Sequence, residues 1–96
     1  MLRALRAGEV SAVELVDLLI GRIRRHEAKL NALVVRDFYR ARDTARAADA
    51  ERATGGDRPL LCLPMTVKDN LNVVGLRMTA GLPRGAPAHV PPAGFE

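Results

Sequence analysis

One stretch of sequence, residues 10–29, restricts the fold more than the rest of the chain does. Its apolar residues recur at the three- and four-residue intervals of an α-helix, so they line one broad face. The segment also begins with a capping box, in which Ser11 and Glu14 each accept a hydrogen bond from the other's backbone N–H. Such a face must be covered by another part of the molecule. Its residues are Val13, Val16, Leu19, Ile20 and Ile23.

A second helix is predicted from about Asp37 to Thr54, where two glycines end it. Its apolar stripe is mostly alanine, which favours close packing on a neighbouring helix. Oppositely charged residues three positions apart support it. Between the two helices, residues 32–35 are a short apolar run, predicted to be a brief strand or an extended segment. The oppositely charged pairs of the second helix are Asp43–Arg46 and Asp49–Arg52.

The segment after Pro59 is almost continuously apolar as far as Val67. A strand buried on both faces has this composition, and such strands belong to parallel sheets covered by helices. We therefore predict a strand over residues 63–67, although Pro64 fits an edge position better than a central one. Helices that alternate with strands in this order are typical of the α/β class.

The charge of the chain is basic but evenly mixed. The net charge is +4, and among the 15 basic residues only Lys29 and Lys68 are lysines. The arginines of the second helix alternate with Asp and Glu, which favours an ion-paired, solvated face over a nucleic-acid surface. A single cysteine excludes an internal disulfide, and no apolar run approaches the roughly 20 residues of a membrane span. We expect a cytoplasmic protein that binds neither nucleic acid nor membrane.

The sequence contains no pattern for a metal ion or cofactor. Two isolated histidines, His26 and His89, and a single cysteine do not make a metal-binding set. The glycines lack the spacing of a phosphate-binding loop. Cys62 lies in an apolar run with no histidine near it in sequence, so a buried structural thiol is favoured over a nucleophile.

Lys68 has the most unusual context of the titratable residues, because it follows the apolar run directly. In α/β folds, polar groups at the carboxyl end of a strand lie where ligands bind. Partial desolvation lowers the pKa of a lysine, and its neutral amine can then accept a proton. A surface lysine at the end of a strand fits the same pattern, and from the residues alone this second interpretation is favoured.

The order and spacing of several blocks resemble the amidase signature family. Residues 59–70 read P-L-L-C-L-P-M-T-V-K-D-N, which is similar to the family's P-L-x-G-φ-P-φ-x-φ-K-D-N, where φ is apolar. The family's G-φ and T-A-G blocks follow as Gly75-Leu76 and Thr79-Ala80-Gly81. Upstream, residues 5–15 and 30–34 resemble the family's opening helix and the segment after it. The similarity covers most of the chain.

The resemblance implies a mixed-sheet α/β fold and hydrolysis of a carboxylic amide C–N bond by a Ser–Ser–Lys triad. In the family, one serine attacks the amide carbonyl, and a second serine connects it to a lysine that acts as the base. Lys68 matches this lysine, and Asp69 and Asn70 match the polar pair that supports the site. The implied substrate is a small-molecule amide. The resemblance does not decide between a free amidase and one component of a tRNA-dependent amidotransferase.

The sequence departs from the family's pattern at four points. Cys62 stands in place of the usual glycine, Met78 in place of a frequent threonine, and Leu82 in place of a frequent serine. The fourth departure concerns the nucleophile, because Ser11 is the only serine and is predicted to cap a helix. The stretch that supplies both family serines would lie beyond Glu96.

These departures predict a fragment that is inactive alone, produced by truncation or by a frame shift. Residues 1–82 are expected to be the N-terminal part of an amidase domain, and residues 83–96 an irregular tail rich in Pro, Gly and Ala. Two other classes of function stay open. The chain could be a small basic module that binds nucleic acid through its second helix, or a helical interaction module that docks through its first. The oligomeric state does not follow from the sequence.

Overall fold

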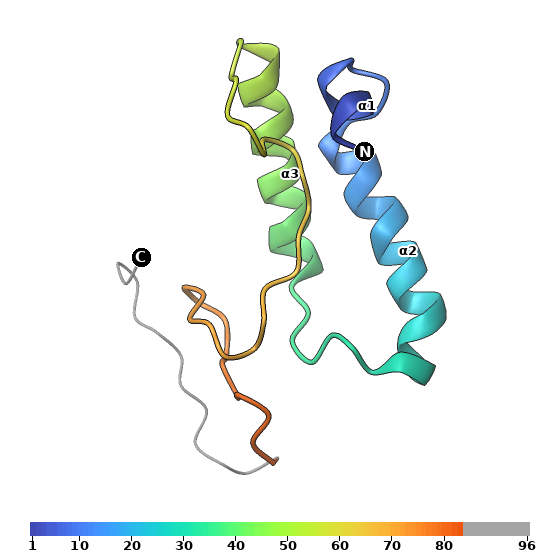
Figure 1. Ribbon diagram of the computed structural model, residues 1–96, viewed down its shortest axis with the longest axis vertical. Coiled ribbons are helices and arrows are strands. Elements are labelled where there is room, and N and C mark those ends of the chain that lie inside the picture. Colours follow the sequence, from blue (N-terminus) through green and yellow to red (C-terminus); the bar gives the residue numbers. More distant parts are fainter. Residues whose placement is uncertain (84–96) are drawn as a thin grey trace. The chain divides into compact units, whose positions relative to one another are not determined.

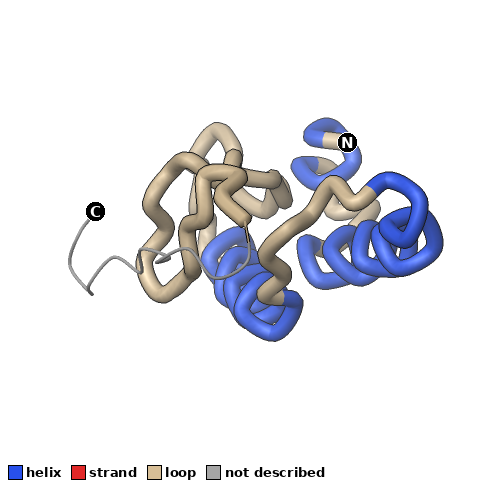
Figure 2. The backbone as a smooth tube through the Cα atoms, turned by 90° about the horizontal axis from the view of Figure 1, so that it is seen from below, coloured by secondary structure: helices blue, strands red, loops and turns tan. Residues whose placement is uncertain are grey.

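The computed structural model describes residues 1–83. The helices within that range are α1 (Leu2–Arg6), α2 (Ala12–Leu30) and α3 (Phe38–Ala53), joined by turns and irregular segments (Figure 1, Figure 2). The chain divides into two compact units. The first consists of residues 1–32 and 37–65 and contains all three of these helices, and the second consists, among the described residues, of 33–36 and 66–83.

The capping box predicted for the first long helix is present at the start of α2. The Ser11 hydroxyl accepts a hydrogen bond from the Glu14 backbone N–H at 3.0 Å, and the Glu14 carboxylate accepts one from the Ser11 N–H at 2.9 Å. The helix ends where Asn31 adopts the left-handed conformation, with φ of 46°, and donates its N–H to the Glu27 carbonyl. The predicted amphipathic helix is therefore confirmed.

The second predicted helix is also confirmed, as α3. Asp37 caps its first turn by accepting a hydrogen bond from the Arg40 N–H at 3.1 Å. Thr54 is the C-cap, and Gly55 follows with φ of 90°, a left-handed conformation that glycine adopts without strain. The short helix α1 was not predicted as a separate element. It is separated from α2 by a turn that contains Gly8, with φ of 73°.

The core of the first unit lies where α2 packs against α3, and the two helices run side by side in Figure 1. Ala45 is the buried residue of α3, and its small side chain permits close approach of the two helices. α1 and the loop after α3 each add one buried side chain. The buried apolar residues are Leu5, Ala12, Leu15, Val16, Ile20, Ala45 and Cys62.

The strand predicted over residues 63–67 is wrong, because residues 1–83 contain no β-strand. The preceding residues form tight turns, in which the Leu61 N–H donates to the Arg58 carbonyl and the Leu63 N–H donates to the Leu60 carbonyl. A strand requires a neighbouring strand that pairs its backbone groups, and the described residues supply none. The apolar run is therefore not buried on both faces: Leu60, Met65 and Val67 are 55%, 67% and 51% exposed.

Two further sequence predictions concern irregular segments. Residues 32–35, predicted to be a brief strand or an extended segment, do not form a strand. The irregular tail predicted for residues 83–96 lies outside the described residues, except for Pro83.

The described part of the second unit is a series of turns. Each is closed by a hydrogen bond from its last backbone N–H to its first carbonyl. Gly75, with φ of 74°, takes the third position of the middle turn, and Ala80 and Gly81, with φ of 50° and 79°, take the two central positions of the last. The turns span residues 68–71, 73–76 and 79–82, with closing distances of 3.0, 2.9 and 2.9 Å.

Candidate functional site

Lys68 occupies the first position of the turn over residues 68–71, where its carbonyl accepts the Leu71 N–H at 3.0 Å. Its side chain is exposed, and its ammonium forms no hydrogen bond or ion pair with any other of residues 1–83. The predicted placement at the end of a buried strand is therefore not observed. The lysine instead projects from a short turn.

The next residue, Asp69, fastens this turn to the segment around Thr79. The Thr79 backbone N–H donates to Oδ1 of Asp69 at 3.0 Å, and the Thr79 hydroxyl donates to Oδ2. The Ala80 N–H donates to the Asp69 backbone carbonyl at 3.0 Å. We call these three hydrogen bonds the Asp69 clamp. It joins the block that resembles K-D-N to the block that resembles T-A-G.

The clamp perturbs the titration of Asp69. The hydrogen bond from the Thr79 hydroxyl, followed by that from the Thr79 N–H, holds the pKa of the Asp69 carboxyl below its ordinary value of 3.8. Desolvation opposes the shift, and the Gly81 and Ala80 N–H groups add to it. Asp69 therefore remains ionised at neutral pH, as a carboxylate that accepts hydrogen bonds.

Asn70, the third predicted site residue, is exposed, and its side-chain amide makes no hydrogen bond to another of residues 1–83. The turn thus places the three predicted residues next to one another, but only Asp69 has partners that fix its side chain. Sequence reasoning missed Thr79, the residue that holds Asp69. The available signal was the T-A-G block, whose threonine is part of the family pattern.

Cys62 is a buried residue of the first unit. Its backbone has φ of 70°, and its thiol donates to the Asp49 carboxylate at 3.8 Å. Burial raises the pKa of the Cys62 thiol, and the nearby Arg52 only partly opposes this. A protonated, enclosed thiol is a poor nucleophile, so the structural interpretation of Cys62 is the one that the geometry supports.

Asp49 of α3 caps the start of α2 from outside that helix. Its carboxylate accepts the Ala12 N–H at 2.8 Å and the Val13 N–H at 3.2 Å, and it also pairs with Arg52 at 3.3 Å. Arg52 in turn donates to the carbonyl of Leu5 at 2.6 Å. The sequence predicted the Asp49–Arg52 pair only as support for one helix. In the structure the pair connects all three helices.

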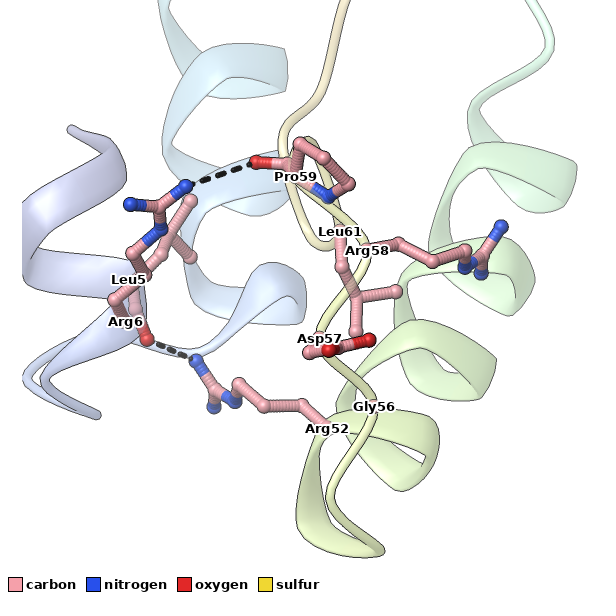
Figure 3. Close-up of a pocket in the computed structure, with 8 residues that line it drawn as sticks. All are labelled: Leu5, Arg6, Arg52, Gly56, Asp57, Arg58, Pro59 and Leu61. Atoms are coloured by element: carbon pink, nitrogen blue, oxygen red, sulfur yellow. Dashed lines mark hydrogen bonds between the residues drawn. The ribbon is translucent and has the colours of Figure 1, made fainter.

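The first unit also contains a shallow cavity of about 240 Å³ (Figure 3). Three arginines line it, but their guanidinium groups already have protein acceptors. Arg6 donates to the Pro59 carbonyl, Arg52 donates to that of Leu5, and Arg58 forms a two-point ion pair with Glu51. The cavity therefore offers little free charge to a ligand. Its lining residues are Leu5, Arg6, Arg52, Gly56, Asp57, Arg58, Pro59 and Leu61.

Ion pairs occupy much of the basic face of α3. Both predicted pairs within the helix are present, with Arg46 at 2.5 Å from Asp43 and Arg52 at 3.3 Å from Asp49. Arg42 forms a further pair with Asp17 of α2, at 2.6 Å. In the described part of the chain there is no group of acidic, histidine and cysteine side chains suited to a metal ion. Nor is any described helix long and apolar enough to cross a membrane.

Comparison with known proteins agrees with the sequence blocks around this turn. A sequence model of the amidase family matches residues 14–89. The A subunit of the glutamyl-tRNA(Gln) amidotransferase of Roseiflexus castenholzii is 49% identical over 75 residues, which make up 78% of this chain and 15% of that protein. The corresponding protein of Moraxella catarrhalis is 42% identical over 77 residues, or 80% of this chain and 16% of that protein.

A hydrolase matches the same region of the chain. The indoleacetamide hydrolase of Bradyrhizobium diazoefficiens is 41% identical over 81 residues, which are 83% of this chain and 16% of that protein. The chain therefore spans only about one sixth of the length of these relatives.

Proposed function

The chain belongs to the amidase family, and on that premise we propose that it provides the lysine base of a Ser–Ser–Lys hydrolase that cleaves carboxylic amide C–N bonds. The observation that carries the proposal is the geometry of the turn at residues 68–71. The Asp69 clamp fixes the backbone of this turn, while the Lys68 side chain is exposed and has no partner among residues 1–83. The backbone that carries the lysine is thus fixed, while its amine is open to a partner.

The proposed chemistry needs groups that these 96 residues do not contain. A serine hydroxyl attacks an amide only when a neighbouring base takes its proton. Ser11 is the sole serine of the chain, and its hydroxyl accepts a hydrogen bond from the Glu14 N–H at the start of α2. We propose that both catalytic serines come from sequence outside these residues. The chain alone then has a base but no nucleophile.

We propose that residues 1–83 belong to a mixed-sheet α/β fold in the whole enzyme, whose strands are supplied by other segments of the protein. The exposed apolar side chains of Met65 and Val67 support this proposal, because further layers of such a fold would cover them.

A chimera tests the lysine assignment. The matched residues of this chain replace the corresponding stretch of the Roseiflexus castenholzii relative, and amide hydrolysis is measured. We expect the chimera to be active, Lys68→Ala to lower kcat by about 10²–10⁴ or more, and the 96-residue chain alone to show no turnover. Lys29→Ala is the matched control, because Lys29 is the other lysine and lies exposed on α2.

The outcomes separate clearly if every variant is first checked for native helix content by circular dichroism. Near-normal turnover of Lys68→Ala would remove the catalytic assignment. Hydrolysis by the 96-residue chain that depends on Lys68 would contradict the proposed need for outside serines.

The relatives suggest the class of substrate that we propose for the whole enzyme. The relatives are an A subunit of a glutamyl-tRNA(Gln) amidotransferase and an indoleacetamide hydrolase. We propose a small carboxylic amide as substrate and a cytoplasmic site of action, with no nucleic acid bound by this chain. Comparing glutamine with indoleacetamide as substrates of the chimera distinguishes the two activities.

A further inference from the structure

In the Asp69 clamp, the carboxylate and the backbone carbonyl of Asp69 accept hydrogen bonds from the segment that begins at Thr79. Both carboxylate oxygens accept from Thr79, and the backbone carbonyl accepts from Ala80. Asp69 and Thr79 are ten residues apart in sequence, and the donors belong to the turn over residues 79–82. Because Ala80 and Gly81 both have positive φ, the chain reverses at this point and directs successive N–H groups toward Asp69.

We propose that Thr79 is a positioning residue for Lys68: its hydroxyl and backbone N–H hold the Asp69 carboxylate and thereby fix the turn from which Lys68 projects. The inference rests on the proposed function of Lys68 as the base. Thr79 touches no reacting group. It acts through Asp69 on the placement of the amine.

Without the clamp, little else would order the turn that carries Lys68. The turn over residues 68–71 is closed by one backbone hydrogen bond, and Lys68, Asn70 and Leu71 are exposed, so packing does not hold it. Hydrogen bonds to an ionised carboxylate are roughly twice as strong as neutral ones. The two bonds from Thr79 are therefore the strongest described contacts that order this turn.

The clamp also determines whether the Asp69 carboxylate forms an ion pair with Lys68. A carboxylate next to a lysine in sequence can pair with its ammonium. In the structure both oxygens of Asp69 are directed to Thr79, and the Lys68 ammonium has no ion-pair partner among residues 1–83. Thr79 thus keeps the carboxylate away from the amine that must accept a proton.

The first test uses the 96-residue chain and needs no activity. The pKa of the Asp69 carboxyl is followed by NMR in Thr79→Val, which removes the hydroxyl, and in Thr79→Ser, which keeps it. We expect a pKa below 3.8 in the natural chain and in Thr79→Ser, and a rise toward 3.8 in Thr79→Val. The matched control is Thr66→Val, whose exposed hydroxyl has no partner among residues 1–83. An unchanged pKa in Thr79→Val would overturn the proposal.

The sign of the pH effect follows from the direction of the shift. Because the folded-state pKa of Asp69 lies below 3.8, the clamp stabilises the turn fully above that value, and the stabilisation is lost as the pH falls through the folded-state pKa. The protection of the Leu71 and Ala80 amides, measured as the exchange rate relative to the intrinsic rate at each pH, should fall over that acidic range in the natural chain. In Thr79→Val this protection should already be low at neutral pH.

The second test uses the chimera described above and separates positioning from simple stability. We expect Thr79→Val to lower kcat roughly 10- to 100-fold with little change in KM, because the amine is misplaced while substrate contacts are kept. Thr79→Ser should restore most of kcat. Normal kcat in Thr79→Val, when Lys68→Ala is inactive, would overturn the inference alone. If Lys68→Ala remains active, the proposed function fails, and the NMR result still decides whether Thr79 holds the turn.

Discussion

Cys62 shows how a single backbone angle relates this chain to its family. Its φ of 70° lies in the left-handed region, where a side chain costs about 1–2 kcal/mol, and the family pattern usually has glycine there. We expect Cys62→Gly to be more stable than Cys62→Ala by about 1 kcal/mol, although both variants lose the packing of the buried thiol. Urea unfolding followed by circular dichroism measures the difference. A less stable glycine variant would mean that the left-handed conformation carries no strain.

Asp49 connects the helices of the first unit by capping α2 from α3. Asp49→Ala leaves the Ala12 and Val13 N–H groups without their acceptor, and it removes the partner of Arg52. We expect this substitution to lower the free energy of unfolding by about 1–3 kcal/mol, as the loss of partners for partly buried donors does. Chemical denaturation of the purified chain provides the measurement.

The same helix offers a control for that prediction. Asp43 also pairs with an arginine three residues later, but its side chain is 75% exposed, against 22% for Asp49. Asp43→Ala should therefore change stability by less than about 0.5 kcal/mol. Equal losses in the two variants would mean that Asp49 contributes only as one more surface ion pair.

Both long helices could be predicted because their signals are local. The capping box at Ser11 and Glu14 fixes the start of α2, and Asp37 and Gly55 mark the two ends of α3. For residues 63–67, local signals could not establish whether a strand forms. An apolar run reports that a segment tends to be buried, but strand formation depends on a pairing partner that lies elsewhere in the fold.

The candidate site was predictable at the level of residue identity and not of geometry. The K-D-N block marked Lys68, Asp69 and Asn70, and the structure places them in one turn. Nothing in the spacing of Asp69 and Thr79 indicates that they are hydrogen-bonded, because contacts between turns do not repeat along the sequence. The tertiary role of Asp49 was missed for the same reason.

The first unit as a whole rests on a thin core. Its buried apolar residues include two alanines and a cysteine, and no aromatic side chain is fully buried among the described residues. Chains of this size rarely gain more than about 3–5 kcal/mol from a single core. The ion pairs on its surface add little to that sum, since exposed pairs contribute about 0–1 kcal/mol each. Stability therefore depends on a few large side chains of α2.

This dependence yields a prediction for two leucine-sized residues of the same helix. Ile20 is 4% exposed within the core, whereas Leu18 is 60% exposed. Replacing a buried isoleucine by alanine costs about 2–5 kcal/mol, which is comparable to the whole stability expected of such a core. Ile20→Ala should therefore lose most of its helical circular dichroism signal at 25 °C, while Leu18→Ala keeps it. If Ile20→Ala still unfolds cooperatively at a similar urea concentration, the helices are held by contacts other than this core.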